Sequence, residues 1–270
     1  MGLSTTQILA RKEFSQNEIE KINSLISRRE AGEPLQYIMG EADFYGRDFI
    51  VGEGVLIPRH DTETLIEGVK KYFAPEEKFS FLDFGTGSGC IAITILLEFK
   101  NSFAYMIEKS DKALTFAKKN LERYGFTPYR DSPSVSARHL PVNGEAECKE
   151  SPLNKGRCQF IDREVKKSTI DLIISNPPYI PSGEISKLDR TVKDFEPSMA
   201  LDGGTDGTDF YKMILSMAMK ILKSKGYIIF EMGNLNQINI VKNFSDDFVF
   251  VDEIFDTGNF PRCLILRRRD

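Results

Sequence analysis

The run Ser175-Asn176-Pro177-Pro178-Tyr179-Ile180 contains the residues with the most specific chemistry in this chain. Two consecutive prolines fix the backbone and remove two N–H donors, so the carbonyl groups of Asn176 and Pro177 become rigid acceptors. The Asn176 side chain adds a further acceptor, and Tyr179 offers a ring for stacking. The pattern predicts a site that binds both hydrogens of a planar NH2 group. The residues predicted to be catalytic and substrate-binding are Asn176, Pro177, Pro178 and Tyr179.

A site of this kind suits group transfer to nitrogen. An amide or exocyclic amino nitrogen is a poor nucleophile, because its lone pair is delocalised. Acceptors that hold both hydrogens aim the nitrogen at an electrophile and stabilise the positive charge that develops on it. No strong general base is required, since the proton leaves after transfer. The alternative is a proline-rich turn that only follows a strand.

A second run, Asp83 to Gly89, has the form D-x-G-x-G-x-G between a predicted strand and a predicted helix. Glycines allow a sharp turn and the close approach of a ligand to the backbone. Glu108 ends the next predicted strand, where a carboxylate can bind both ribose hydroxyls of a nucleoside cofactor. NAD and S-adenosylmethionine both fit, but Asp83 favours S-adenosylmethionine because it can face the cationic methionine end. The predicted cofactor-binding residues are Asp83, Gly85, Thr86, Gly87, Ser88, Gly89, Glu108 and Asn176.

Strands and helices alternate around these two runs. The predicted strands are 79–84, 102–108, one near 159–162, 170–175, 227–231, 248–254 and 263–267, and the main helices are 90–99, 111–123 and 208–223. This alternation predicts an α/β fold with a doubly wound, mostly parallel sheet of seven strands. Residues 127–157 contain four prolines and no periodicity, so we expect a flexible surface insertion there.

The amino-terminal part of the chain has a different pattern. Ser15 and Glu18 match the S-x-x-E capping box ahead of a helical apolar stripe, and Gly32 is suited to end that helix. We expect a helical substrate-recognition lobe over 1–40 that leans on the rest of the chain. A hairpin or linker is expected over 41–57, and the catalytic domain over 58–270.

Composition narrows the class of protein. The 270 residues are 41% hydrophobic and carry a net charge of −4, which excludes fibrous and wholly disordered proteins. The slight acidic excess argues against a broad nucleic-acid-binding surface. Four cysteines without a CxxC pair, and only two histidines, predict reduced thiols and no metal site. No signal peptide or membrane-length apolar run occurs, so we expect a soluble, cytoplasmic protein.

Outside 127–157, nearly the whole chain resembles the protein release factor glutamine methyltransferases (PrmC/HemK). The matching motifs include Val55 to Glu63 (VLIPRHDTE), Asp83 to Gly89, Ser175 to Pro181, and Leu201 to Gly204 (LDGG). The resemblance implies a class I, Rossmann-like methyltransferase that uses S-adenosylmethionine. Such enzymes methylate the side-chain amide nitrogen (N5) of the glutamine in the Gly-Gly-Gln motif of class I peptide chain release factors.

The resemblance also implies roles for individual residues. Asp162 and Arg163 occupy the place near the adenine, and Arg59 and Glu63 brace the substrate site at the lobe junction. The alternative for the last two is an ion pair with a helix-capping role. The helical lobe is shorter than is usual in the family, and His60 stands where proline is usual. We expect a monomer that binds release factors and contacts neither membranes nor nucleic acid directly.

Two alternative functions are compatible with the same motifs. An adenine-N6 methyltransferase would place the exocyclic amine of a flipped base in the same NH2 site. Such an enzyme needs a basic recognition surface, which the sequence does not show. A SAM-binding adaptor of the translation machinery would bind the cofactor without turnover.

Overall fold

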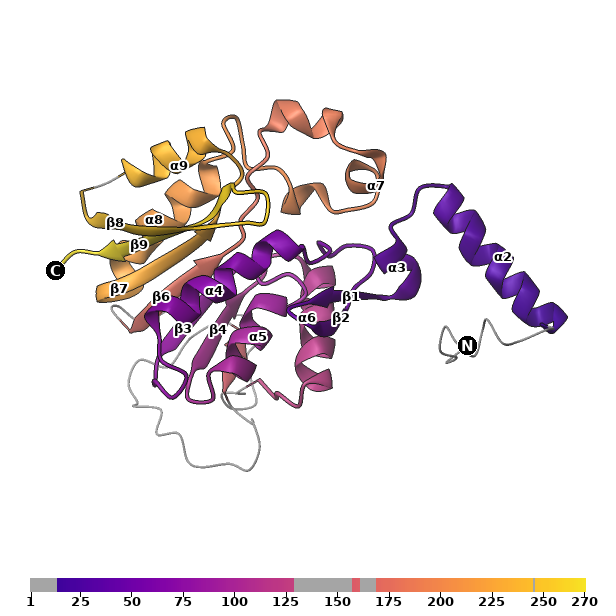
Figure 1. The fold of residues 1–270 in the computed structure, drawn as a ribbon, viewed down its shortest axis with the longest axis horizontal. Coiled ribbons are helices and arrows are strands. Elements are labelled where there is room, and N and C mark those ends of the chain that lie inside the picture. Colours follow the sequence, from indigo (N-terminus) through magenta and orange to yellow (C-terminus); the bar gives the residue numbers. More distant parts are fainter. Residues whose placement is uncertain (1–13, 129–156, 161–168, 245) are drawn as a thin grey trace.

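The computed structural model describes residues 14–128, 157–160, 169–244 and 246–270. Its centre is a sheet with the spatial order β5-β4-β3-β6-β7-β9-β8 (Figure 1). The strands from β5 to β7 run parallel, and β9 is antiparallel to both β7 and β8. The predicted seven-stranded, mostly parallel α/β sheet is therefore confirmed. The strands are β3 (Ser80–Phe84), β4 (Phe103–Ile107), β5 (Cys158–Phe160), β6 (Ile170–Ser175), β7 (Leu222–Glu231), β8 (Phe248–Phe255) and β9 (Pro261–Arg268).

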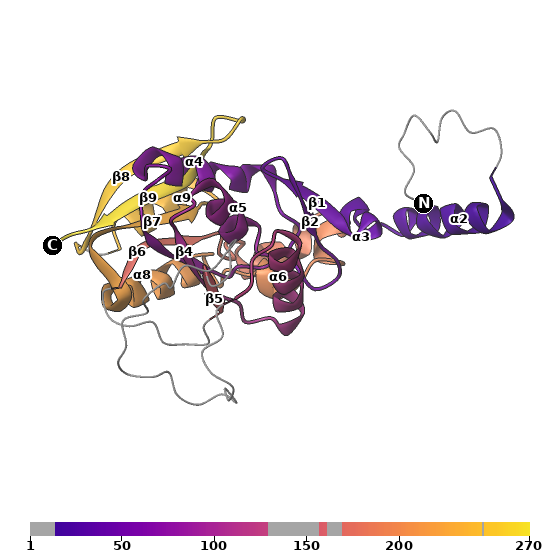
Figure 2. The ribbon, with the colours of Figure 1, turned by 90° about the horizontal axis from the view of Figure 1, so that it is seen from below.

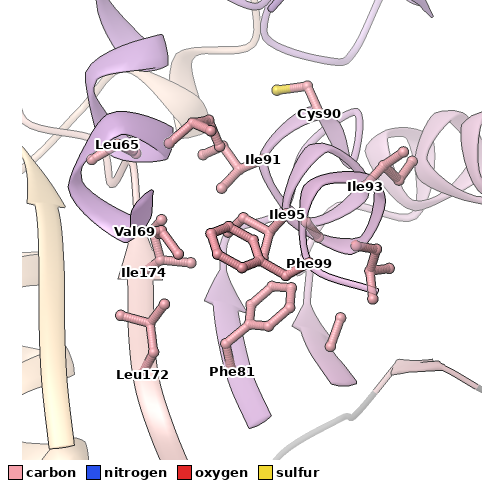
Figure 3. Packing of buried hydrophobic residues seen from close by; sticks show 14 of the residues in the cluster. Leu65, Val69, Phe81, Cys90, Ile91, Ile93, Ile95, Phe99, Leu172 and Ile174 are labelled. Atoms are coloured by element: carbon pink, nitrogen blue, oxygen red, sulfur yellow. The ribbon is translucent and has the colours of Figure 1, made fainter. Parts of the chain in front are cut away.

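Helices cover both faces of the sheet. On one face α4 (Glu63–Tyr72), α5 (Cys90–Glu98) and α6 (Asp111–Arg123) pack around Phe81, Leu172 and Ile174 (Figure 3). On the other face α8 (Asp209–Ile221) and α9 (Leu235–Lys242) pack against Ile173 and Phe230. Successive strand residues point to opposite faces, so neighbours such as Leu172 and Ile173 serve different cores. Fully burying each of these side chains contributes about 1.5–3 kcal/mol.

One predicted boundary is wrong. The helix expected over 208–223 ends at Ile221, and Leu222 begins β7 opposite Ile170. Leu222 is fully buried, so pairing with the neighbouring strand prevails over the helical periodicity. In contrast, α6 begins and ends where the sequence predicts, with Ser110 as its N-cap.

A hairpin joins the amino-terminal part to the sheet domain. Its strands are β1 (Glu41–Phe44) and β2 (Arg47–Ile50), which pair antiparallel around a Tyr45-Gly46 turn. Both turn residues have positive φ, as tight two-residue hairpins require. Phe44 and Phe49 are fully buried in the core that contains α5. The hairpin over part of 41–57 is thus present, and its division from neighbouring domains stays a prediction.

The first described helix, α2 (Gln16–Glu30), has the predicted ends. Ser15 and Glu18 form the capping box, and Gly32 adopts φ 95° just beyond the helix. Of the lobe expected over 1–40 to lean on the rest of the chain, α2 itself does not do so. None of its residues is buried, and it extends away from the sheet (Figures 1 and 2). The following α3 (Leu35–Met39) does pack on the domain, because the hydroxyl of buried Tyr37 donates to the Val55 carbonyl at 2.5 Å.

Short helical turns lie between β6 and α8. They are η2 (Ser182–Lys187), α7 (Arg190–Lys193) and η3 (Ser198–Ala200), and a further turn, η1 (His60–Thr62), precedes α4. Most of the expected insertion at 127–157 lies outside the described residues. At its far end Arg157 donates to the carbonyls of Leu96 and Phe99, at 3.0 and 2.7 Å.

Within the described ranges, no helix has both the length and the apolar character needed to span a bilayer. The cysteines that the structure describes as free thiols are all buried: Cys90, Cys158 and Cys263.

Candidate active site

The two predicted functional runs meet at the carboxyl edge of the parallel strands. The glycine run follows β3, Glu108 follows β4, and Asn176 follows β6. The chain reverses its direction of winding between β3 and β6, because β4 lies on one side of β3 and β6 on the other. Ligands of open α/β sheets bind at such a switch point. The topology therefore brings both predicted sites to one crevice.

The glycine loop is fastened to the end of β4. The N–H groups of Gly85 and Thr86 both donate to the Ile107 carbonyl at 2.9 Å. Gly85, Gly87 and Gly89 have φ values of 74°, 57° and 82°, which side chains with a Cβ rarely adopt. No heavy atom lies within 4 Å of the place where a Cβ of Gly85 would sit. A ligand can therefore approach the loop backbone on that side.

Glu108 lies directly beside this loop. Its Oε2 accepts a hydrogen bond from the Gly87 N–H at 2.8 Å, and its Oε1 accepts from the Ser110 N–H at 2.8 Å. Each carboxylate oxygen can accept a second hydrogen bond. The geometry thus fits a carboxylate that is held in place and still able to bind hydroxyl groups. Ribose binding by Glu108 stays a prediction.

Asp83 is fully buried beneath the loop. Its Oδ2 accepts from the Thr86 hydroxyl at 2.5 Å, and its Oδ1 has no hydrogen-bond partner among the described residues. Burial raises the pKa of the Asp83 carboxyl to about 7. Such a half-satisfied carboxyl fits a cationic ligand group above it. Thr86 and Ser88 are themselves buried.

The segment Asn176 to Tyr179, hereafter the amide cradle, presents the predicted acceptors. Among the described residues, no N–H group donates to the backbone carbonyl of Asn176 or Pro177. The side-chain Nδ2 of Asn176 donates to the Thr62 hydroxyl at 3.1 Å. The side-chain oxygen of Asn176 is therefore left as an acceptor. The structure thus agrees with the predicted chemistry, and the catalytic roles stay predictions.

The LDGG motif packs against the backbone of the amide cradle. A Cβ on Gly203 would lie 2.7 Å from both the Pro178 carbonyl oxygen and Tyr179 Cα. The buried side chain of Gln237 donates to the Tyr179 carbonyl at 2.7 Å and accepts from the Gly233 N–H at 3.2 Å. Sequence reasoning missed Gln237, which lies 58 positions from Tyr179. The pair of glycines in LDGG was the available signal for a close backbone approach.

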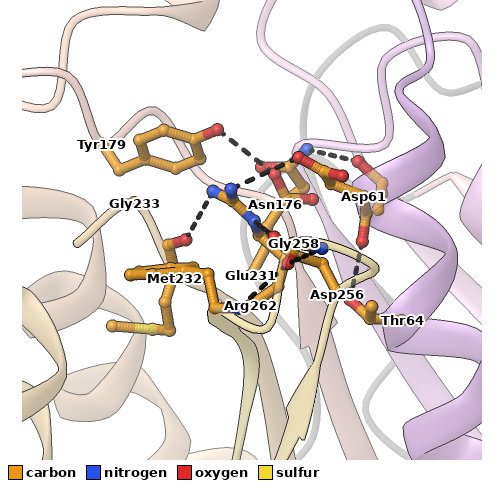
Figure 4. Close-up of polar contacts among 12 residues, drawn as sticks. Asp61, Thr64, Asn176, Tyr179, Glu231, Met232, Gly233, Asp256, Gly258 and Arg262 are labelled. Carbon is orange, nitrogen blue, oxygen red and sulfur yellow. Dashed lines mark hydrogen bonds and ion pairs between the residues drawn. The ribbon is translucent and has the colours of Figure 1, made fainter. Parts of the chain in front are cut away.

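Sequence reasoning also missed Glu231, a fully buried carboxyl at the end of β7. Its Oε1 accepts from the Tyr179 hydroxyl at 3.2 Å (Figure 4). Burial raises the pKa of Glu231 to about 7, against the opposing effects of Thr62, Arg262 and Tyr179. The sequence does contain a signal for this residue, because Glu231 is an acidic residue directly after the apolar stretch Tyr227 to Phe230.

Arg262 belongs to the same cluster, and its positive charge lowers the pKa of this carboxyl (Figure 4). Its guanidinium contacts Asp61 at 3.3 Å and Asp256 at 3.2 Å, and donates to the Met232 carbonyl at 3.1 Å. A single cation is thus held between two carboxylates and one carbonyl.

Arg59 and Glu63 do not pair with each other. Arg59 forms an ion pair with buried Glu196, whose other oxygen accepts from the Ile57 N–H at 3.1 Å. Glu63 accepts from the Tyr45 N–H at 2.9 Å, which ties the start of α4 to the hairpin turn. Both residues therefore brace the junction, and substrate binding by them stays a prediction. The predicted adenine-site residues Asp162 and Arg163 lie outside the described residues.

His60 belongs to the only group among the described residues with metal-ligand spacing. Ligand atoms of Asp43, His60 and Glu63 lie within 4.8 Å of one another. The His60 side chain is 80% exposed, and Glu63 Oε1 already serves the Tyr45 N–H. Exposed acidic groups commonly cluster without an ion, so we assign no metal here.

Replacing Gly203 by alanine should destabilise the fold, because the new methyl group would overlap the backbone of the amide cradle. Overpacking of this kind costs about 1–3 kcal/mol in the free energy of unfolding, measured by urea denaturation. Gly183→Ala is the matched control, since a Cβ there meets nothing within 4 Å. Equal stabilities of the two variants would contradict the close contact.

The buried Asp83 carboxyl should make stability depend on pH. Its pKa is about 7 in the folded protein against a usual 3.8, so the fold favours the protonated form. The free energy of unfolding contributed by this group therefore falls as pH rises through that window. In a plot of the free energy of unfolding against pH, the Asp83 contribution makes the parent protein lose stability between pH 5 and 7. In Asp83→Asn this loss should be smaller by about 1 kcal/mol per pH unit. Parallel curves for the two proteins would mean that Asp83 ionises normally.

The chain is similar to known methyltransferases in sequence and fold. Family models match at residues 1–40 (PrmC N-terminal domain) and residues 95–236 (Eco57I restriction-modification methylase). Release factor glutamine methyltransferase of Geobacter sulfurreducens is 37% identical over 82% of this chain and 68% of the relative. The enzyme of the same name from Koribacter versatilis is 35% identical over 95% of this chain and 82% of its own length.

A solved methyltransferase structure from Pyrococcus furiosus superimposes with a TM-score of 0.55 at 15% identity. It covers 95% of this chain and all of that protein, which supports the fold alone. The sequence relatives go further, because they are more than 30% identical over 82% and 95% of this chain. The chain belongs to the family of release factor glutamine methyltransferases.

Proposed function

We propose that this protein transfers the methyl group of S-adenosylmethionine to the side-chain amide nitrogen of a glutamine. The glutamine is that of the Gly-Gly-Gln motif in class I release factors. The observation that carries the proposal is the set of unpaired acceptors in the amide cradle, next to the glycine loop. The names of the sequence relatives support the release factor as substrate.

The residues around the glycine loop fit S-adenosylmethionine. When bound, this cofactor supplies an electrophilic methyl group on a positively charged sulfur. The backbone of Gly85 to Gly89 would hold the cofactor, and Glu108 would accept hydrogen bonds from its ribose. The unpartnered Oδ1 of Asp83 offers a buried acceptor for the ammonium of the methionine end, whose positive charge would favour the ionised carboxylate. A ligand group without a hydrogen to donate in that place would leave this oxygen unsatisfied.

The amide cradle would then hold and activate the glutamine. The side-chain oxygen of Asn176 and the carbonyl of Pro177 accept the two amide hydrogens, and the Tyr179 ring covers the amide plane. These contacts orient the nitrogen for in-line attack. They strengthen as positive charge develops on the nitrogen, which lowers the barrier selectively in the transition state. The extra proton is lost to solvent after transfer, so no residue must act as a strong base.

We infer a docking place for the protein substrate from a groove in the surface. A groove of about 390 Å³ lies between α3 and α7, and its lining includes Leu35, Gln36, Arg59, Thr191 and Glu196. Arg59 lies three positions before Thr62, whose hydroxyl contacts Asn176. A loop of the release factor that crosses this groove would be led toward the amide cradle.

Methylation of adenine N6 is the second candidate. The match to the Eco57I restriction-modification methylase over residues 95–236 includes the amide cradle, and an exocyclic amine fits the same acceptors. The net charge of −4 opposes it, because binding to nucleic acid rests on neutralising phosphates.

Methyl-transfer assays with labelled S-adenosylmethionine test both functions. The substrates are a class I release factor, its Gly-Gly-Gln→Gly-Gly-Ala variant, and unmethylated DNA that contains adenine. The proposal predicts label on the intact release factor alone. Label on DNA would establish the second candidate. Binding of S-adenosylmethionine without any transfer would indicate the non-catalytic adaptor.

Replacing Asn176 by alanine should reduce methyl transfer by about 100-fold or more, because one of the acceptors for the amide hydrogens is lost. The Kd for S-adenosylmethionine, measured by calorimetry, should change little. Asn243→Ala is the control, since this exposed asparagine hydrogen-bonds only within α9 and its cap. Full activity of the Asn176 variant would refute the role of the cradle.

Replacing Glu108 by alanine should weaken S-adenosylmethionine binding by about 10- to 100-fold, as expected for losing hydrogen bonds to a charged acceptor. The exposed Glu122→Ala on α6 should leave the Kd unchanged. Equal affinities of the two variants would remove Glu108 from the cofactor site.

A further inference from the structure

The Tyr179 ring can cover the amide plane of the substrate only if it keeps one orientation. A tyrosine side chain turns about two bonds, and it loses this freedom only through contacts with its neighbours. Pro177 and Pro178 fix the backbone before it but not the side chain itself. Contacts from other elements must therefore hold the ring.

The end of β7 provides two such contacts, one at the hydroxyl group and one at the ring (Figure 4). The Tyr179 hydroxyl donates to Glu231 Oε1 at 3.2 Å. Gly233 lies against the same side chain, because a Cβ added there would be 2.5 Å from Tyr179 Cδ2 and 3.1 Å from Cε2. A residue with a side chain would collide with the ring in this place. Tyr179 is only half-buried, so part of it stays open to a ligand.

The backbone that carries the Glu231 side chain is itself held in place. The Glu231 carbonyl accepts from the buried Tyr211 hydroxyl at 2.7 Å. The Met232 N–H donates to the Arg262 carbonyl at 2.7 Å, and the Met232 carbonyl accepts from the Arg262 guanidinium at 3.1 Å. These bonds leave the backbone little freedom, so the carboxyl of Glu231 offers the Tyr179 hydroxyl a fixed partner.

The hydrogen bond between Tyr179 and Glu231 does not depend on the charge of the carboxyl. Burial raises the pKa of the Tyr179 hydroxyl, which therefore keeps its proton and remains a donor. Glu231 Oε1 can accept this bond either in a carboxylate or as the carbonyl oxygen of a protonated carboxyl. The contact is thus compatible with the raised pKa of Glu231, about 7.

The main chain of Tyr179 is tied to the same segment, since Gln237 donates to the Tyr179 carbonyl at 2.7 Å and accepts from the Gly233 N–H at 3.2 Å. We propose that Glu231 and Gly233 are positioning residues that hold the Tyr179 ring in the orientation in which it covers the substrate amide. This inference rests on the proposed transfer to an amide nitrogen. It assigns Glu231 and Gly233 no contact with the substrate.

Glu231→Met and Glu231→Gln test the hydrogen bond. Methionine has a similar length but no oxygen, so the Tyr179 hydroxyl loses its partner. In this variant kcat should fall by about 10- to 100-fold, as for a misplaced reacting group, while the Kd for S-adenosylmethionine stays the same. Glutamine can bond to a hydroxyl through either end of its amide, so Glu231→Gln should keep kcat within about threefold of the parent value. Equal kcat values for the two variants would overturn the role of this bond.

Tyr179→Phe removes the other partner of the same hydrogen bond and keeps the ring. Its kcat should fall to a similar extent as that of Glu231→Met. Because the two changes delete one shared interaction, the double variant should be no slower than the slower single variant. Multiplied losses in the double variant would mean that the two side chains act independently, which would contradict the proposal.

Gly233→Ala tests the contact with the ring. Gly233 does not have a positive φ, so alanine there tests the available space alone. The added methyl group should push the Tyr179 ring aside and lower kcat by about 10-fold or more, with the Kd for S-adenosylmethionine unchanged. Gly183→Ala is the matched control, because Gly183 also lacks a positive φ and a Cβ there meets nothing within 4 Å. The parent kcat in Gly233→Ala would overturn the contact.

The ¹³Cζ signal of Tyr179 gives a readout that needs no substrate, and its absence in Tyr179→Phe assigns it. This carbon carries the hydroxyl, so its shift should change in Glu231→Met, where the hydrogen bond is lost, and in Gly233→Ala, where the ring is displaced. It should keep the parent value in Gly183→Ala. An unchanged shift in both test variants would contradict the proposal. If the parent methylates no release factor while these shifts appear as expected, the proposed function fails and the hold on Tyr179 stands.

Discussion

The backbone carbonyls of Asn176 and Pro177 must remain without hydrogen-bond donors at the edge of a hydrogen-bonded sheet. Much of the site holds this segment in place without using those two carbonyls. Pro177 and Pro178 remove the N–H groups that would otherwise fold back on the strand end. The unpaired segment is then held by contacts that do not use those carbonyls. Gly203 packs against its backbone, and Gln237 binds the Tyr179 carbonyl farther along. The acceptors thus stay free because other groups supply the rigidity.

The pairing of β3 with β6 aligns the glycine loop and the amide cradle on the two sides of the crevice. Asp83 on β3 pairs with Ile174 on β6, so the glycine loop and the amide cradle leave the sheet at the same level. The Ser175 hydroxyl donates to the Phe84 carbonyl at 2.7 Å and joins the two strand ends. Asn120 on α6 connects the glycine loop to the hairpin, since its side chain donates to the carbonyls of Ser88 and Ile50. Hairpin, glycine loop and cradle are therefore one connected unit.

Local patterns predict the parts of this fold that local chemistry determines. The capping box at Ser15 and the bounds of α6 are predictable because their interactions span a few residues. The start of β7 at Leu222 is not, because it depends on pairing with Ile170. Glu231 gives a sequence signal as an acid at the end of an apolar strand. Its hydrogen-bond partner Tyr179 and the nearby charge of Arg262 come from distant segments, so no spacing rule connects them.

The most direct test of the central claim is a crystal structure with the demethylated cofactor product and a Gly-Gly-Gln peptide. The account predicts that the glutamine amide nitrogen lies within about 3 Å of both Asn176 Oδ1 and the Pro177 carbonyl oxygen. Tyr179 should cover the amide plane, and Asn176 Nδ2 should still face Thr62. A glutamine bound away from these acceptors, or an Asn176 side chain that presents its NH2 to the substrate, would contradict the account.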